Sequence, residues 1–142
     1  MNGVHQGLLL SKNASTSPEA QAGAVITNVE GLSLTELGFD VRDGGQCNAI
    51  SPRFVVATTD GMMHTVGGCG KGTPQSAAVM GWKRLRFDPS KPDQAFPPIT
   101  PGQQVKSITL IVDQGPEAGP NAAGGVVVLD NIEVNGILVG KQ

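Results

Sequence analysis

Residues 124–136, GGVVVLDNIEVNG, decide the fold that this sequence predicts. The β-branched and aliphatic run Val126–Leu129 follows two glycines and predicts a buried strand. The Asn135–Gly136 pair that ends the stretch is typical of a tight two-residue turn, so residues 137–139 are expected to pair back onto the strand. Asp130 lies inside this apolar stretch, and its carboxylate needs a partner because an unpaired buried charge is very costly. It is therefore either a structural polar site or a functional acid.

The composition of the whole chain agrees with a β-rich protein. The 142 residues suit a single domain, 1–142, and a hydrophobic content of 39% is enough for a core. The 20 glycines and 10 prolines separate short apolar runs, as turns separate strands. The net charge is −2 without a basic stripe, which argues against nucleic-acid partners. No apolar run approaches the roughly 20 residues that span a membrane, and residues 1–10 lack the basic start of a secretion signal.

Alternation of apolar and polar side chains predicts the other strands. In residues 32–42, Leu37, Phe39 and Val41 share one face, and charged side chains occupy the other. Further strands are expected at 8–12, 22–30, 82–88 and 105–114. Eight or nine short strands with almost no helix bury their alternating faces best as an all-β fold. The expected architecture is a two-sheet antiparallel sandwich of the jelly-roll type.

A hairpin is expected within residues 53–68. Its centre is Asp60–Gly61, the pair that a two-residue type I′ turn favours because both positions need positive φ. In that register Ala57 lies opposite His64. After the hairpin, Thr73 and the proline that follows it predict one short helical turn, with the threonine as its cap.

The order of these pieces resembles bacterial carbohydrate-binding modules with the β-jelly-roll fold. In that family a strand like 106–114, KSITLIVDQ, precedes a Gly-rich loop and a last strand that ends in a triplet like 130–132, Asp-Asn-Ile. The resemblance implies polysaccharide binding and a structural Ca²⁺ ion held by Asp130, with Glu30 and Asn13 as candidate partners. The chain departs from the family in having one Trp and no Tyr, whereas sugar-binding modules usually expose several of these residues.

One strand carries a candidate ligand platform. Trp82, Arg84 and Arg86 are expected on the outward face of residues 82–88, with Arg42 and Asp40 on a charged face nearby. The face of a Trp ring stacks on the apolar side of a sugar, and Arg donates forked hydrogen bonds to hydroxyls or carboxylates. These residues predict a secreted, non-catalytic module that binds an extracellular polysaccharide.

The same residues allow other interpretations. Trp82 could belong to the core, with the arginines paired to Glu36 and Asp40. Alternatively, Asp40, Glu36 and His64 could serve a small extracellular hydrolase or lyase that acts on glycans. A third interpretation is a structural, self-assembling β domain that forms a homo-oligomer, since the chain has few charges and an apolar final strand.

The two cysteines bear on the cellular location. Cys47 and Cys69 stand 22 positions apart without neighbouring ligands for zinc. The favoured interpretation is a disulfide that closes the open end of the 53–68 hairpin, which would constrain the unfolded chain by roughly 3 kcal/mol. Disulfides persist in oxidising compartments, so this bond would agree with an extracellular location.

Overall fold

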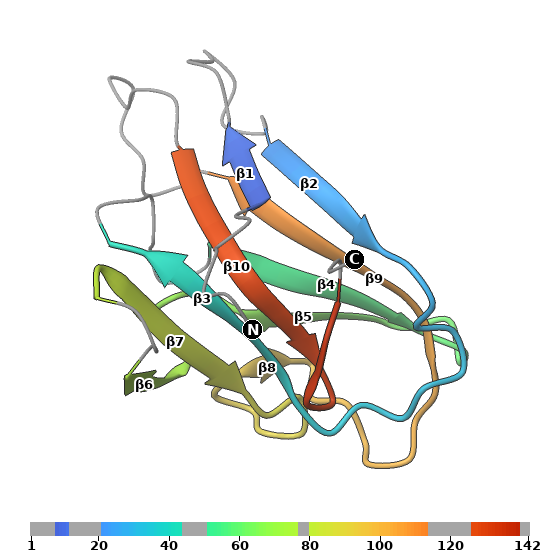
Figure 1. The fold of residues 1–142 in the computed structure, drawn as a ribbon. Helices are drawn as coiled ribbons and strands as arrows, with labels where there is room; N and C mark the ends of the chain where they lie inside the picture. Colours follow the sequence, from blue (N-terminus) through green and yellow to red (C-terminus); the bar gives the residue numbers. More distant parts are fainter. Residues whose placement is uncertain (1–7, 12–20, 44–50, 77–79, 114–125, 140–142) are drawn as a thin grey trace, which may run out of the picture.

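The described part of the molecule consists of strands joined by turns and loops (Figure 1). The computed structural model describes residues 8–11, 21–43, 51–76, 80–113 and 126–139. Within these residues no helix is long and apolar enough to cross a membrane. The strands are β1 (Leu8–Ser11), β2 (Gln21–Ile26), β3 (Leu37–Arg42), β4 (Arg53–Thr58), β5 (Met63–Gly67), β6 (Thr73–Ser76), β7 (Trp82–Phe87), β8 (Ala95–Phe96), β9 (Val105–Asp113), β10 (Val126–Val134) and β11 (Ile137–Leu138).

The strands form two antiparallel sheets that face each other. Sheet A has the order β1-β10-β3-β7-β6, and β11 also pairs with β10. Sheet B has the order β2-β9-β4-β5-β8. The first four strands alternate between the sheets, and the late strands β10 and β9 lie beside the early strands β1 and β2 (Figure 1). The predicted all-β antiparallel sandwich is therefore confirmed.

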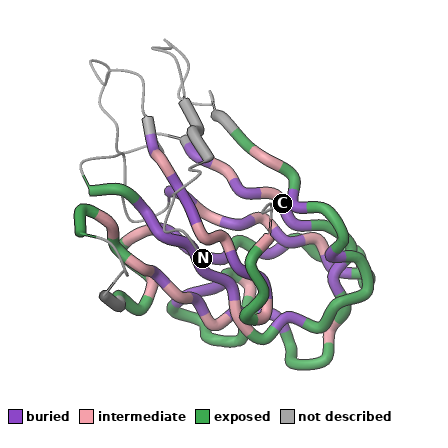
Figure 2. The backbone as a smooth tube through the Cα atoms, in the orientation of Figure 1, coloured by how far each residue is buried: buried purple, intermediate pink, exposed green. Residues whose placement is uncertain are grey.

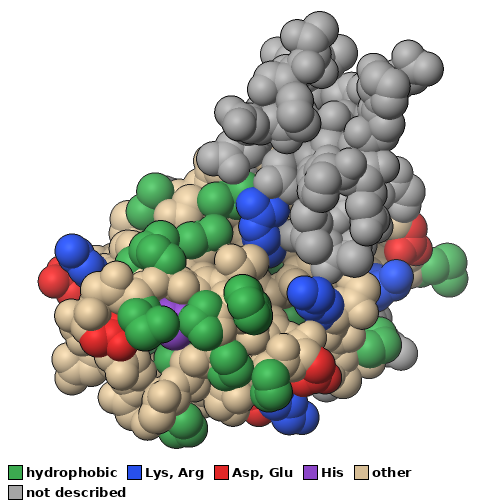
Figure 3. Space-filling model, turned by 180° about the vertical axis from the view of Figure 1, so that it is seen from behind, with side chains coloured by type: hydrophobic (Ala, Val, Ile, Leu, Met, Phe, Trp, Pro, Cys, Tyr) green, Lys and Arg blue, Asp and Glu red, His purple; other side chains and the backbone are tan. Residues whose placement is uncertain are grey.

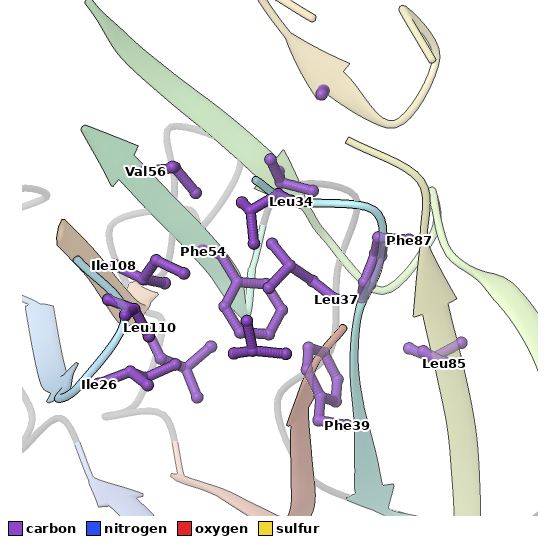
Figure 4. Packing of buried hydrophobic residues seen from close by; sticks show 14 of the residues in the cluster. Ile26, Leu34, Leu37, Phe39, Phe54, Val56, Leu85, Phe87, Ile108 and Leu110 are labelled. Atoms are coloured by element: carbon purple, nitrogen blue, oxygen red, sulfur yellow. The ribbon is translucent and has the colours of Figure 1, made fainter. Parts of the chain in front are cut away.

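Both sheets contribute aromatic rings to one core. Phe39 of β3 and Phe87 of β7 lie 5.5 Å apart between ring centroids, and Phe54 of β4 lies 5.8 Å from Phe39 across the sandwich (Figure 4). Each ring is at most 1% exposed. Figure 2 shows burial concentrated along the strands and exposure in the turns. Burying one such side chain contributes roughly 1.5–3 kcal/mol, so these rings anchor the two layers.

The alternation predicted for sheet A is confirmed. Leu37, Phe39 and Val41 of β3 face the core, as do Leu85 and Phe87 of β7. The intervening side chains of both strands therefore lie on the opposite, outer face of the sheet. This outer face of sheet A carries the residues predicted to bind ligand.

The hairpin between β4 and β5 differs from its predicted register by one residue. Ala57 lies opposite Met63 instead of His64. The connection is a three-residue loop, 59–61, in which Gly61 has a φ of 87°. A loop of this length, ending in a left-handed residue, is the common alternative to a two-residue turn. Because side chains alternate along a strand, the shift places His64 in the core and Met63 in solvent.

The segment after this hairpin also corrects the prediction. Residues 73–76 form strand β6 rather than a helical turn. Thr73 lies opposite Arg86 of β7, and Pro74 opposite Leu85. β6 is at the edge of sheet A, where a proline is tolerated because one side of the strand needs no ladder hydrogen bonds.

The predicted reversal after β10 is confirmed. Asn135 and Gly136 have φ values of 54° and 80°, as a type I′ turn requires, and Ile137 pairs back onto Val134. The Asn135 side chain also binds the segment before β3. Its Oδ1 accepts hydrogen bonds from the backbone nitrogen of Thr35 (2.7 Å) and from the Thr35 hydroxyl (3.1 Å). The turn thus fixes the approach to β3.

Candidate functional site

Three strands of sheet A bring the predicted ligand residues together. Trp82, Arg84 and Arg86 lie at alternate positions of β7 and share its outer face. On the neighbouring strand β3, their respective cross-strand partners are Arg42, Asp40 and Gly38. β10 flanks β3 on its other side. The face predicted from the sequence therefore exists, and its central residues are engaged with one another.

Arg84 binds three acceptors at the centre of this face. Its Nη2 donates to Oε1 of Glu133 at 2.5 Å, and its Nη1 donates to Oδ1 of Asp40 at 3.2 Å. Nη1 also donates to the carbonyl of Asn131 at 2.7 Å. The Arg84 side chain is 12% exposed, and the two carboxylate side chains are 3–4% exposed. A buried charge is tolerable when it is paired and hydrogen-bonded, which is the case for all three groups.

A β-bulge in β10 makes this arrangement possible. The register between β10 and β3 shifts between Asp130 and Glu133, and Asn131 has a φ of 46°. Asn is one of the few residues that enter the left-handed region readily. Its Nδ2 donates to Oδ2 of Asp40 at 2.8 Å, and its backbone nitrogen donates to Oδ1 of Asp130 at 2.7 Å. The bulge therefore supplies a carbonyl to Arg84 and an amide to Asp40.

Gly38 leaves the space that the pair between Arg84 and Glu133 occupies. A Cβ atom at this position would lie 2.8 Å from Oε1 of Glu133 and 2.9 Å from the carbonyl of Leu85. It would also lie 3.2 Å from Nη2 of Arg84. Gly in the interior of a strand often marks such a close approach. We call Arg84, Asp40, Glu133, Asn131 and Gly38 the Arg84 cluster.

A second ion pair borders the Arg84 cluster. Nη1 of Arg86 donates to Oε1 of Glu36 at 2.8 Å and lies 3.4 Å from Oε1 of Glu133. The hydrogen bond to Glu36, together with the charge of Glu133, raises the pKa of Arg86 above its ordinary value. The side chains of Arg86 and Glu36 are 37% and 31% exposed, so solvent screens this pair more than the Arg84 cluster.

The accessible part of the platform is smaller than the sequence predicted. Asp40 and Arg84 bind each other and are not available to a ligand. This agrees with the alternative interpretation in which the arginines pair with Glu36 and Asp40. Arg42 is exposed, Trp82 is half-buried, and they are direct cross-strand neighbours. Trp82 is thus not a core residue. These two residues, with the half-exposed Arg86, are the part of the predicted site that a ligand can reach.

The alternative catalytic residues are not assembled. His64 lies on β5 of sheet B with its side chain toward the interior, whereas Asp40 and Glu36 belong to the outer side of sheet A. Nδ1 of His64 lies 2.7 Å from the carbonyl of Pro97, so it must carry the donated hydrogen. Nε2 lies 3.2 Å from the Thr58 hydroxyl. The histidine therefore serves the packing of sheet B.

The described residues show no set of ligands for the predicted calcium ion. Within the described ranges no group of three or more His, Cys, Asp or Glu side chains is placed to hold a metal ion. Asp130 accepts a hydrogen bond from the Asn131 backbone instead, and Glu30 is exposed. Asn13 lies outside the described residues. Calcium binding by Asp130 stays a prediction.

The disulfide also stays a prediction, because Cys47 lies outside the described residues. Cys69 is half-buried and packs against the core. It follows β5, the strand whose end the disulfide was expected to secure.

Several residues of this region escaped sequence reasoning. Glu133 was not among the predicted site residues, yet it makes the shortest hydrogen bond with Arg84. The available signal was Gly38, a glycine in the middle of an alternating strand. A groove of about 710 Å³ between β2 and the β10–β11 hairpin was not predicted either. Its described walls are mostly aliphatic, with Val25, Leu32, Ile137 and Leu138 at the surface.

No model of a protein family matches this chain, and no curated protein and no solved structure matches it either.

Proposed function

We propose that this protein is a non-catalytic β-sandwich module that binds an extracellular polysaccharide on the outer face of sheet A. The observation that carries the proposal is the cross-strand pair of Trp82 and Arg42 beside the Arg84 cluster. The indole offers an apolar face for stacking, and the guanidinium offers donors for ring hydroxyls. The buried ion pairs of the Arg84 cluster connect β3, β7 and β10. They therefore hold in place the strands that carry Trp82 and Arg42.

Charge favours a neutral sugar over an acidic one at this face. Its carboxylates are Asp40, Asp130, Glu133 and Glu36, and its guanidiniums are those of Arg42, Arg84 and Arg86. Among the described residues of this face, four negative groups against three positive groups leave no surplus of positive charge to attract a carboxylate or sulfate. The Trp82 and Arg42 pair therefore supports recognition of neutral rings through stacking and hydroxyl contacts.

The hydrogen bonds of this face support binding rather than cleavage. Glycoside hydrolysis requires one carboxyl group that gives a proton to the leaving oxygen. Asp40, Glu133 and Glu36 instead accept hydrogen bonds from arginines. No pair of carboxyl groups on the described part of this face is left in the roles of acid and base.

The strand order supports a jelly-roll assignment within the sandwich class. Early and late strands are neighbours in both sheets: β1 with β10, and β2 with β9. This is the pattern expected when a long antiparallel pair folds over on itself into two Greek keys. Carbohydrate-binding modules that this sequence resembles share that architecture, although a fold alone does not define a function. Secretion is part of the proposal and rests on the predicted disulfide.

Calorimetry against a panel of neutral and acidic polysaccharides tests the proposal. We expect at least one neutral polymer to bind and Trp82→Ala to weaken that binding tenfold or more. Met62→Ala removes an exposed side chain next to the β4–β5 loop of sheet B, whereas β7 belongs to sheet A, so this variant should bind as the unaltered protein does. Binding that survives Trp82→Ala in a folded variant would remove the proposed site.

A further inference from the structure

The outer face of sheet B differs in character from that of sheet A. One outward side chain from each strand lies in a continuous cross-strand row, and neighbours in this row are paired in the ladders. From β8 to β2 the row consists of Phe96, Thr65, Val55, Thr109 and Val25. Phe96 and Val25, at its two ends, are 77% and 70% exposed. We call this set the middle row.

The rows on either side of the middle row are also poor in charge. One contains Met63, Ala57 and Ser107, and Met63 is 59% exposed. The other contains Arg53 and Ile111. Arg53 is the charged side chain of these rows, and the exposed Lys106 lies at the bulge of β9 beside Ser107. Figure 3 looks onto this side of the molecule and shows hydrophobic side chains spread across it.

Several large apolar side chains exposed on one face, as Phe96, Met63 and Val25 are here, mark an interaction surface. The occupant must offer a flat, uncharged surface in return. The outer face of sheet A is rich in ion pairs and fits poorly, because its charges would lose water without gaining partners. The middle row itself carries no charge, so a second copy packed row against row brings no like charges together along this row.

We propose that a second copy of this chain covers the outer face of sheet B, so that two sandwiches associate back to back. Val55 is the central member of the middle row and would lie near the two-fold axis. Phe96 and Val25 would meet the partner near the two edges of the sheet. The proposal is independent of ligand binding on sheet A.

The size of the face sets the strength of this dimer. Five strands at a spacing of about 4.8 Å span about 19 Å, and three rows span about 13 Å along the strands. With side-chain margins, the face covers on the order of 500 Å² per copy, below the roughly 800 Å² of a standard stable interface. The dimer should therefore be weak and should form as the protein concentration rises.

Sedimentation of the full chain over micromolar to millimolar concentrations tests the inference. We expect the unaltered protein to shift reversibly from monomer to dimer. Val25→Lys and Phe96→Lys should each raise the concentration of half-dimerisation tenfold or more, because a lysine would be desolvated in the interface. Ile137→Lys is the matched control: Ile137 is 69% exposed but belongs to sheet A, so its dimerisation should match that of the unaltered protein.

The outcomes separate this face from other modes of association. An effect of Val25→Lys without an effect of Phe96→Lys would overturn the proposal in favour of pairing through the free edge of β2. A protein that stays monomeric at every concentration would overturn it as well. Amide shift changes on dilution, followed by NMR, provide a second measurement. Changes confined to the sheet B strands β2, β4, β5, β8 and β9 support the proposal, and changes confined to sheet A contradict it.

Discussion

Arg84 shows how a single residue can be both the best candidate for a ligand contact and the least available one. Its position on an outward strand face suggested contact with a partner. The structure instead places two carboxylates and a carbonyl around it. Removing one member of a buried ion pair is costly because the remaining charges lose their compensation. Arg84 is therefore important for stability, whatever the ligand.

Replacing this arginine should reveal that role. We expect Arg84→Met to lower the free energy of unfolding by about 3–5 kcal/mol, since the buried Asp40 would lose its guanidinium partner and Glu133 would keep only the more distant contact with Arg86. Arg42→Met changes an exposed residue on the same face and should cost no more than about 0.5 kcal/mol. Urea denaturation of both variants measures the difference. Equal stabilities would show that the cluster is not a stabilising unit.

Asp60 illustrates a different kind of polar residue, one in a solvent-exposed loop. Its Oδ1 accepts hydrogen bonds from the Thr58 hydroxyl at 2.5 Å and from the Met62 backbone at 3.1 Å. The Thr58 bond, then the Met62 bond and the nearby His64, lower the pKa of Asp60 from its ordinary value of 3.8. Its contribution to stability is therefore present above that value and is lost as the pH falls through the lower folded-state pKa.

This linkage predicts an acid-sensitive loop. The stability difference between the unaltered protein and Asp60→Asn should be constant at neutral pH and should change below about pH 4. The asparagine retains an acceptor oxygen but does not titrate in this range. Denaturation curves between pH 7 and pH 2 measure the effect. A difference that stays flat down to pH 2 would contradict the assignment.

At the scale of strands, alternation was a sound guide and register was not. β3 and β7 follow the predicted alternation because each has one apolar and one charged face. β4 and β5 lack that contrast, so a two-residue and a three-residue loop fit their sequences equally well. Asp60–Gly61 occurs in both loop types. The hydrogen bonds of Asp60 to Thr58 and Met62 accompany the observed loop, and such contacts cannot be read from the pattern of apolar residues.

The candidate site was predictable to the same extent. The outward grouping of Trp82 and the arginines follows from alternation alone. The Arg84 cluster does not, because the bulge at Asn131 shifts the register of β10 against β3. By alternation alone, Asp130 and Glu133 are three positions apart and would lie on opposite faces of the sheet. The bulge places both of them opposite outward positions of β3, at Asp40 and Gly38. A bulge adds one residue and leaves no trace in a simple period of two.

The β10–β11 hairpin has a tertiary role that can be tested at one residue. Asn135→Gly keeps the positive φ of the turn and removes the side chain that binds Thr35 and the carbonyl of Ser33. We expect a loss of about 1–3 kcal/mol in the free energy of unfolding, from hydrogen bonds worth about 0.5–1.5 kcal/mol each. Chemical denaturation measures this loss. Unchanged stability would mean that the turn does not depend on this connection.

For the whole molecule, the main feature is the contrast between its two outer faces. Sheet A exposes Trp82 and Arg42 beside paired charges, and sheet B exposes an uncharged, mostly apolar row across its five strands. A sandwich needs apolar residues only on its two inner faces, so the apolar character of the second outer face is not required by the fold. The two faces are available for separate interactions.

This separation predicts independent behaviour. Phe96→Lys should lose dimerisation and keep the polysaccharide affinity of a single site, whereas Trp82→Ala should lose that affinity and dimerise normally. Calorimetry on dilute, monomeric protein and sedimentation at high concentration measure the two properties. If Phe96→Lys lowered the affinity of the dilute monomer, the two faces would be coupled.

The back-to-back arrangement has a mechanical consequence. The two indoles of such a pair would point in opposite directions, so one polymer strand could not easily reach both. The pair would instead bridge separate strands, and mixing it with a soluble polymer should raise the viscosity of the solution. A protein of this size could then act as a reversible crosslinker whose strength depends on its local abundance.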